Sequence, residues 1–78
     1  MVKRRVIFTF STEVIREPII YTFSQQFKVA TNILRADLSE EAGWLMLELD
    51  GTRKNIEQGI EWVISRGVRV EPISEEIA

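Results

Sequence analysis

The middle of the chain reads ATNILRADL over residues 30–38, SEEAG over residues 39–43 and WLMLEL over residues 44–49. Apolar residues occupy every second position in the later part of the first segment and in the third, and a period of two residues is typical of a strand with one buried face. The polar segment between them has the composition of a turn. The sequence therefore predicts two consecutive strands, at about residues 30–38 and 44–49, joined by a short turn.

Helical spacing of apolar residues predicts one helix on each side of this strand pair. The first helix runs from Pro18 to about Phe27, because proline is well tolerated at the first helical position. The second follows Thr52, a candidate N-cap, and ends before Gly67, which suits a left-handed position after a helix. The apolar stripes of the two helices comprise Ile19, Ile20, Phe23 and Phe27, and then Ile56, Ile60, Val63 and Ile64.

Strands are also predicted at both ends of the chain. Residues 6–10 alternate with the period of a strand, and residues 68–70 begin a short last strand. We expect Pro72 to end that strand, since proline cannot donate a hydrogen bond to a neighbouring strand. The acidic tail, residues 74–78, is expected to fray.

The element order β-α-β-β-α-β predicts one α+β domain over residues 1–78, with an ordered core of about residues 4–73. Right-handed crossovers and short connections favour a split βαβ arrangement. The expected fold is a ferredoxin-like βαββαβ sandwich, in which an antiparallel four-stranded sheet carries both helices on one face. Because this fold hosts many functions, it does not by itself indicate an activity.

Strand side chains alternate between the two faces of a sheet, so the strand sequences predict which residues face the helices. The apolar set on the helix side is predicted to be Val6, Phe8, Phe10, Leu34, Ala36, Leu38, Leu45, Leu47, Leu49, Val68 and Val70. The helix-free side, called the open face below, then carries Arg5, Ile7, Thr9, Ile33, Arg35, Asp37, Trp44, Met46, Glu48, Arg69 and Glu71. Four of these are large and apolar, and such a patch is a candidate interface. The alternative is that neighbouring Arg and Glu stems cover them.

The composition of the chain argues against several classes of function. The 78 residues include no cysteine and no histidine, and the net charge is -2. The missing side chains are the usual ligands of zinc and iron–sulfur sites and the usual activators of nucleophiles, so we expect no metal, no cofactor and no catalysis. An acidic chain is a poor partner for nucleic acid. No apolar run approaches the ~20 residues that span a bilayer, and the start lacks the apolar region of a signal peptide. We therefore expect a cytoplasmic protein without direct membrane insertion.

Other patterns carry less weight. RNA-binding domains share this element order and stack bases on strand aromatics, but the open face offers only Trp44 for that purpose. Glu57 and Glu61 lie one helical turn apart, yet they fall on a solvent face, where a carboxylate pair does not indicate acid–base catalysis. Trp62 lies on the flank of the second helix and is expected at the edge of the core.

The tripeptide Asn32-Ile33-Leu34 begins the second strand just after an amphipathic helix, and this context resembles the NIL domain family. The family's element order fits from about residue 5 to residue 73. NIL domains are small ligand-binding modules attached to ATPase subunits of bacterial methionine importers, and they also precede cysteine-rich segments in small ferredoxin-like iron–sulfur proteins. This chain has no such segment, so it is either a stand-alone module or part of a longer protein.

The resemblance implies a regulatory domain that senses methionine or a related sulfur amino acid, with Asn32, Ile33 and Leu34 at the ligand. An amide can donate to a carboxylate and accept from an ammonium, which suits an amino acid. By alternation Asn32 is expected on the helix side, where it could instead satisfy loop backbone groups. The alternative function is an interaction or homodimerisation subunit, without a ligand, for an enzyme of sulfur amino-acid metabolism or a ferredoxin system. Its predicted interface comprises Ile7, Ile33, Arg35, Trp44 and Met46.

Overall fold

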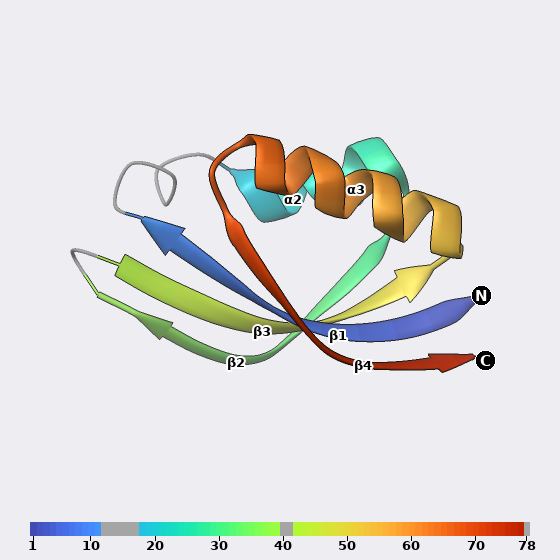
Figure 1. The fold of residues 1–78 in the computed structure, drawn as a ribbon, viewed down its shortest axis with the longest axis horizontal. Helices are drawn as coiled ribbons and strands as arrows, with labels where there is room; N and C mark the ends of the chain where they lie inside the picture. The colour runs from blue at the N-terminus through green and yellow to red at the C-terminus, as the bar shows by residue number, and fades with distance from the viewer. Residues whose placement is uncertain (12–17, 40–41, 78) are drawn as a thin grey trace.

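The computed structural model of the chain describes residues 1–11, 18–39 and 42–77. A four-stranded antiparallel sheet carries both helices on one face, and the sheet curls toward them (Figure 1). The strands lie in the order β2-β3-β1-β4, with every neighbouring pair antiparallel. The predicted ferredoxin-like α+β fold is confirmed. The elements are β1 (Val2–Ser11), α2 (Ile19–Phe27), β2 (Ala30–Leu38), β3 (Ala42–Gly51), α3 (Arg53–Ser65) and β4 (Arg69–Ile77).

The core lies between the sheet and the two helices, and a line of aromatic rings runs through it. The ring centroids of Phe8 and Phe23 are 5.9 Å apart with their planes at 81°. Phe27 lies 6.2 Å from Phe23, and Trp62 lies 5.9 Å from Phe27. Such edge-to-face and tilted contacts add to the stabilisation that burial supplies. Trp62 is partly buried against the core, as predicted.

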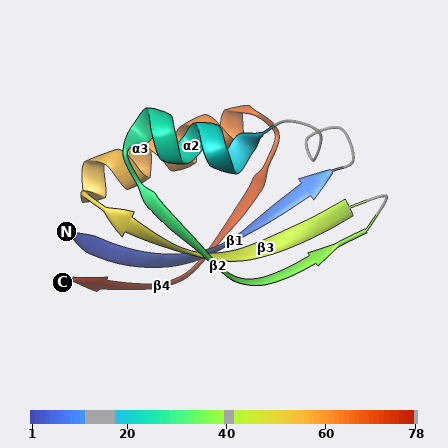
Figure 2. The same cartoon turned by 180° about the vertical axis from the view of Figure 1, so that it is seen from behind.

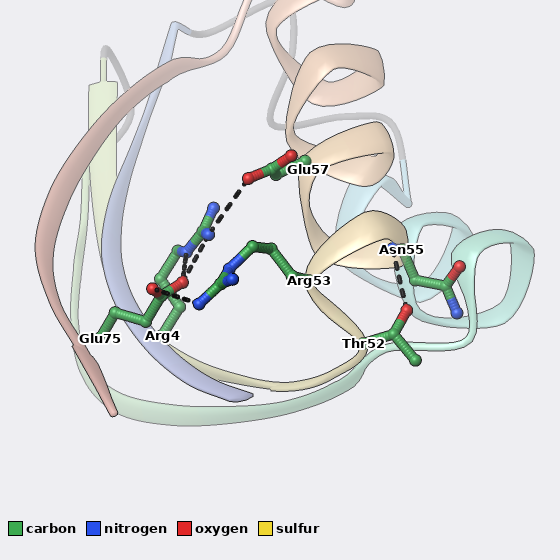
Figure 3. A network of polar contacts seen from close by, with 6 residues as sticks. All are labelled: Arg4, Thr52, Arg53, Asn55, Glu57 and Glu75. Atoms are coloured by element: carbon green, nitrogen blue, oxygen red, sulfur yellow. Dashed lines mark hydrogen bonds and ion pairs between the residues drawn. The ribbon is translucent and has the colours of Figure 1, made fainter. Parts of the chain in front are cut away.

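The ends of the helices follow the sequence signals closely. Thr52 Oγ1 accepts a hydrogen bond from the backbone N–H of Asn55 at 3.0 Å, which confirms the predicted N-cap (Figure 3). Gly67 adopts a φ of 92°, in the left-handed region that glycine tolerates best. Pro18 is the N-cap residue of α2 rather than its first helical residue, and Lys28 ends that helix with a φ of 55°.

One part of the predicted apolar stripe of α3 is wrong. Ile64 is 53% exposed, whereas Gly59 is buried against the ring of Phe23. A Cβ atom on Gly59 would lie only 2.6 Å from Cε2 of Phe23. The missing side chain allows this close approach of α2 to α3, so the buried side of α3 is centred on Ile56, Gly59 and Val63.

The last strand is longer than predicted. β4 continues through Pro72 to Ile77 and remains paired with β1. Proline is tolerated in an edge strand such as β4, because no further strand lies on its outer side to require the missing N–H group. The register shifts between Arg5 and Val6, which leaves Ile73 as the extra residue of a β-bulge. The prediction that Pro72 ends the strand is therefore wrong.

β2 lies at the opposite edge of the sheet (Figure 2). None of its residues is buried. Leu34 and Leu38 were predicted to be core residues, yet they are 38% and 59% exposed. Ala36 between them is also exposed. On the neighbouring strand Leu47 is completely buried. The helices thus cover the middle of the sheet and leave its β2 edge open, and the prediction of a helix-covered β2 is wrong.

A polar network joins the first turns of α3 to β1 and β4 (Figure 3). Nε and Nη2 of Arg4 both donate to Oε1 of Glu75, at 2.9 and 2.5 Å. Arg53 donates to the other carboxylate oxygen at 3.3 Å, and Arg4 also lies 3.6 Å from Glu57. The hydrogen bond from Arg4, followed by the positive charges of both guanidinium groups, lowers the pKa of the Glu75 carboxyl.

This lowered pKa predicts a pH-dependent contribution to stability. The folded state favours the carboxylate, so its contribution is fully present above the ordinary pKa of 4.5 and is lost as the pH falls through the folded-state pKa. We expect Glu75→Gln to be less stable than the wild type at neutral pH, with a difference that shrinks in acid. Urea unfolding at several pH values measures this, with Glu61→Gln on the exposed side of α3 as control. A difference that does not change with pH would contradict it.

Candidate ligand site at the edge strand β2

The pairing between β2 and β3 contains one irregularity, and it lies within the Asn32-Ile33-Leu34 motif. Asn32 pairs with Glu48 and Ile33 pairs with Leu47, but the next paired residue is Arg35, which lies opposite Met46. Leu34 therefore has no partner on β3 and is the extra residue of a β-bulge.

The bulge changes which face each motif residue occupies. Residues that pair directly across two strands share a face of the sheet. Glu48 lies on the open face, so Asn32 lies there too, whereas Ile33 shares the helix side with buried Leu47. Both placements are opposite to those predicted by simple alternation. Beyond the bulge, Arg35 returns to the open face as predicted.

The structure therefore divides the motif between the two sides of one edge. Ile33 and Leu34 are 54% and 38% exposed, and both remain outside the core. Together with Leu38 they form an exposed apolar strip along β2. An edge strand that exposes apolar side chains as well as unpaired backbone groups is a natural place for a ligand or partner to bind.

The open face brings polar groups together in a row that crosses the strands. Asn32 on β2, Glu48 on β3 and Arg5 on β1 are successive cross-strand neighbours. Arg5 Nε donates to Glu48 Oε2 at 3.2 Å, and the two side chains are 51% and 22% exposed. An amide, a carboxylate and a guanidinium thus lie side by side, with strands about 4.8 Å apart. The sequence does not indicate this row, because simple alternation predicts Asn32 on the helix side of the sheet.

The side chain of Asn32 forms no hydrogen bond with any residue that the structure describes. The backbone groups of Val29, between α2 and β2, are satisfied by Ser24 instead. Ser24 Oγ donates to the carbonyl oxygen of Val29 at 2.7 Å, and the Val29 N–H donates to the carbonyl of Ser24 at 3.3 Å. The loop-satisfying role considered for Asn32 is therefore not seen, and its amide is accessible.

Four of the five predicted interface residues lie together on the open face. Arg35, Met46 and Ile7 form one row across three strands, and Trp44 lies in the adjoining row. The three apolar side chains are half-buried rather than fully exposed. Ile33 lies on the other side of the sheet, so the predicted apolar patch loses one member.

The family model described as the NIL domain matches residues 4–72, which include the bulged motif strand. The chain belongs to the NIL domain family. No curated protein sequence matches the chain.

Solved structures resemble this NIL domain over nearly its whole length. The C-terminal domain of an ABC transporter ATP-binding protein from Enterococcus faecalis has a TM-score of 0.80 at 28% identity, covering 91% of this chain and 83% of that one. The de novo designed protein Foldit4 has a TM-score of 0.62 at 11% identity, covering 99% and 97%. An amidase of the hydantoinase/carbamoylase family from Burkholderia phymatum has a TM-score of 0.52 at 16% identity, covering 94% and 28%. The last two likenesses show the fold alone.

Among the described residues, one shallow hollow of about 250 Å³ lies on the open face and another of about 250 Å³ lies between the helices. The sequence did not indicate either, because each combines residues from separate elements. The hollow on the open face is lined by Thr9, Asp37, Ser39, Ala42, Gly43 and Trp44. The hollow between the helices is lined by Pro18, Ile19, Thr22, Trp62 and Arg66.

Within the described residues no helix could span a membrane. In the same part of the chain, no group of three or more acidic side chains could hold a metal.

Proposed function

We propose that this NIL domain is a non-catalytic regulatory module that binds methionine or a related sulfur amino acid on the open face beside Asn32. The observation that carries the proposal is the accessible amide of Asn32, unbonded to the described residues and in one row with Glu48 and Arg5. A side-chain amide both donates and accepts, so it can bind either end of a zwitterion.

The neighbours of Asn32 supply the two charges that a zwitterion requires. The Glu48 carboxylate suits an ammonium group, and the Arg5 guanidinium suits a carboxylate through its paired donors. These two side chains now form an ion pair at 3.2 Å. A solvent-exposed ion pair contributes only about 0–1 kcal/mol of free energy, so its replacement by contacts to a ligand loses little stability.

Apolar side chains lie in the next row along the same two strands. Met46 follows two positions from Glu48, and Ile7 follows two positions from Arg5. Two residues along a strand span about 6.6 Å, a length that an extended thioether side chain matches. A methionine aligned with the strands would place its charged end on the polar row and its thioether between Met46 and Ile7.

The ligand regulates a partner if its binding changes the equilibrium by which the open face associates with that partner. A ligand shifts such an equilibrium only through a difference in affinity between two states. The similarity to the C-terminal domain of an ABC transporter ATP-binding protein supports a partner of that class, with the NIL domain in the cytoplasm. Binding on a site this open should be weak, in the range of about 1 μM to 1 mM.

A methionine titration followed by amide chemical shifts tests this proposal. We expect shifts centred on residues 31–34 together with Arg5 and Glu48, and smaller changes on α3, because the site lies on the far side of the sheet from that helix. Norleucine, which replaces the sulfur with a methylene group, serves as the matched ligand. Amide shifts of residues 31–34 that stay unmoved at ~10 mM methionine, above the expected affinity range, would overturn the proposal.

The exposed apolar strip of Ile33, Leu34 and Leu38 favours a second function. An interaction subunit would bind a partner along this edge, through strand pairing and these side chains, without any amino acid. An enzyme of sulfur amino-acid metabolism or a ferredoxin system is the corresponding partner class. An unresponsive titration together with protected β2 amides in a mixture with such a partner would favour this function over the first.

A further inference from the structure

The hollow between the helices lies where the start of α2 meets the end of α3, at one end of the helix layer (Figure 1). Pro18, Ile19 and Thr22 line it on the side of α2, and Trp62 and Arg66 on the side of α3. Its volume of about 250 Å³ is slightly below the range of about 300–1,000 Å³ that is usual for ligand pockets. The hollow therefore has room for one small molecule.

The wall of this hollow is largely apolar and is held in place by the core. Ile19 is buried, and Trp62 is half-buried. The Trp62 ring lies 5.9 Å from the ring of Phe27, which fixes its position from the core side. Because proline, isoleucine and a packed indole ring have little freedom to lose, this wall can bind a flat apolar group at a small cost in ordering.

The polar groups of the hollow are hydrogen-bond donors. The guanidinium carbon of Arg66 lies 5.6 Å from the centroid of the Trp62 ring, in a cation–π contact. A guanidinium group has five N–H donors in one plane, so one that lies over a ring still presents donors along its edge. The Thr22 hydroxyl, which can also donate, forms no hydrogen bond with any residue that the structure describes. A carboxylate is the group that such donors bind best.

The charges around the hollow also favour an anion over a zwitterion. The described lining residues include the positive charge of Arg66 and no acidic side chain. A carboxylate bound there is attracted by Arg66, whereas the ammonium group of an amino acid is repelled and finds no carboxylate in return. In this respect the hollow differs from the row of Asn32, Glu48 and Arg5 on the open face, which offers both charges.

We infer that the hollow between the helices is a second ligand site, which binds a small aromatic carboxylic acid without an ammonium group. The aromatic ring lies against Pro18, Ile19 and the indole of Trp62. The carboxylate accepts hydrogen bonds from Arg66 and Thr22. This site is on the helix side of the sheet, so the inference does not depend on the ligand proposed for the open face. A hollow this shallow should bind weakly, with a dissociation constant of about 1 mM.

Titration with 3-phenylpropanoate tests the inference, with 3-phenylpropanamide and phenylalanine as matched ligands. The amide replaces the carboxylate with a neutral group, and phenylalanine adds an ammonium group to the same carbon skeleton. We expect 3-phenylpropanoate to cause saturable amide shifts of residues 19–22 and 62–66 by ~20 mM, well above the expected dissociation constant. In that titration residues 31–34 should stay unmoved. The two matched ligands should bind this site at least about tenfold more weakly, because each loses a charged interaction.

The fluorescence of Trp62 gives a second readout of the same site. The chain has two tryptophans, so Trp44→Phe leaves Trp62 as the single one, and Trp44 lies on the other side of the sheet. A ring that binds against Trp62 changes the surroundings of its indole. The fluorescence should therefore change along the titration with the same dissociation constant as the amide shifts.

Two variants assign the polar contacts to their residues. Arg66→Gln removes the positive charge, and Thr22→Val removes the hydroxyl at nearly constant volume. Each should weaken the binding of 3-phenylpropanoate about tenfold or more, because a hydrogen bond to a charged group is lost. Thr22→Val leaves the charge and the end of α3 unchanged, so it tests the site even if Arg66→Gln alters that end of the helix.

Lys54→Gln is the matched control for the charge. Lys54 is exposed in the first turn of α3, at the far end of that helix from the hollow. This variant changes the net charge as Arg66→Gln does, and it should leave the affinity for 3-phenylpropanoate unchanged. The absence of saturable shifts at residues 19–22 and 62–66, an equal affinity for 3-phenylpropanamide, or an equal effect of Lys54→Gln would overturn the inference.

Discussion

Phe23→Ala is expected to lower the free energy of unfolding by about 3–5 kcal/mol, as removal of a buried aromatic ring usually does. Phe23 is completely buried, and its ring lies between Phe8, Phe27 and the backbone of Gly59. A domain of this size has a total stability of about 4–12 kcal/mol. The variant should therefore be close to unfolding, with a melting temperature lower by about 4–8 °C for each kcal/mol lost. Urea and thermal unfolding followed by circular dichroism measure both quantities.

A double-mutant cycle with Gly59 shows whether the Phe23 ring sets the distance between the helices. In the wild type, Gly59→Ala should be destabilising, because the added Cβ would lie 2.6 Å from the ring and overpacking costs about 1–3 kcal/mol. In the Phe23→Ala background the ring is absent, and alanine should stabilise the helix by up to about 1 kcal/mol. Gly51→Ala is the control, since its Cβ would meet no atom closer than 3.5 Å. Equal effects of Gly59→Ala in both backgrounds would contradict the packing.

Asn32→Ala is expected to weaken methionine binding by about tenfold or more while leaving the fold unchanged. A hydrogen bond to a charged group is worth about 1.5–3 kcal/mol, and 1.4 kcal/mol corresponds to a factor of ten in affinity. Asn32 is exposed and bonds to no described residue, so its loss should change the free energy of unfolding by less than about 0.5 kcal/mol. Calorimetric titration and thermal unfolding of the same protein separate the two effects.

Two further variants make this measurement specific to the site. Gln58→Ala removes an exposed amide from α3, on the other side of the molecule, and should leave the affinity unchanged. Ile33→Ala alters the motif on the helix side, where the bulge has placed it, and should weaken binding less than Asn32→Ala. A lower melting temperature with unchanged affinity for Asn32→Ala would instead assign the amide a structural role.

The candidate site could be predicted only in part. The motif residues were found by their resemblance to a family, and the open face by the two-residue period of the strands. Glu48 and Arg5 were placed on the correct face but were not connected with Asn32. Simple alternation places Asn32 on the wrong face because it takes no account of the bulge at Leu34. One unpaired residue reverses the face of every strand residue that precedes it.

The sequence alone determined the element order, and with it the fold. A period of two in the strands, a helical period in the apolar stripes, the Thr52 cap and the left-handed Gly67 are local signals, and short right-handed connections leave few ways to assemble them. Tertiary structure decided the features that depend on pairing and packing between elements. These are the bulge at Leu34 that turns Asn32 to the open face, the continuation of β4 past Pro72, and the close contact at Gly59 that rotates α3. Each depends on which atoms a neighbouring strand or helix presents, and the local sequence does not contain that information.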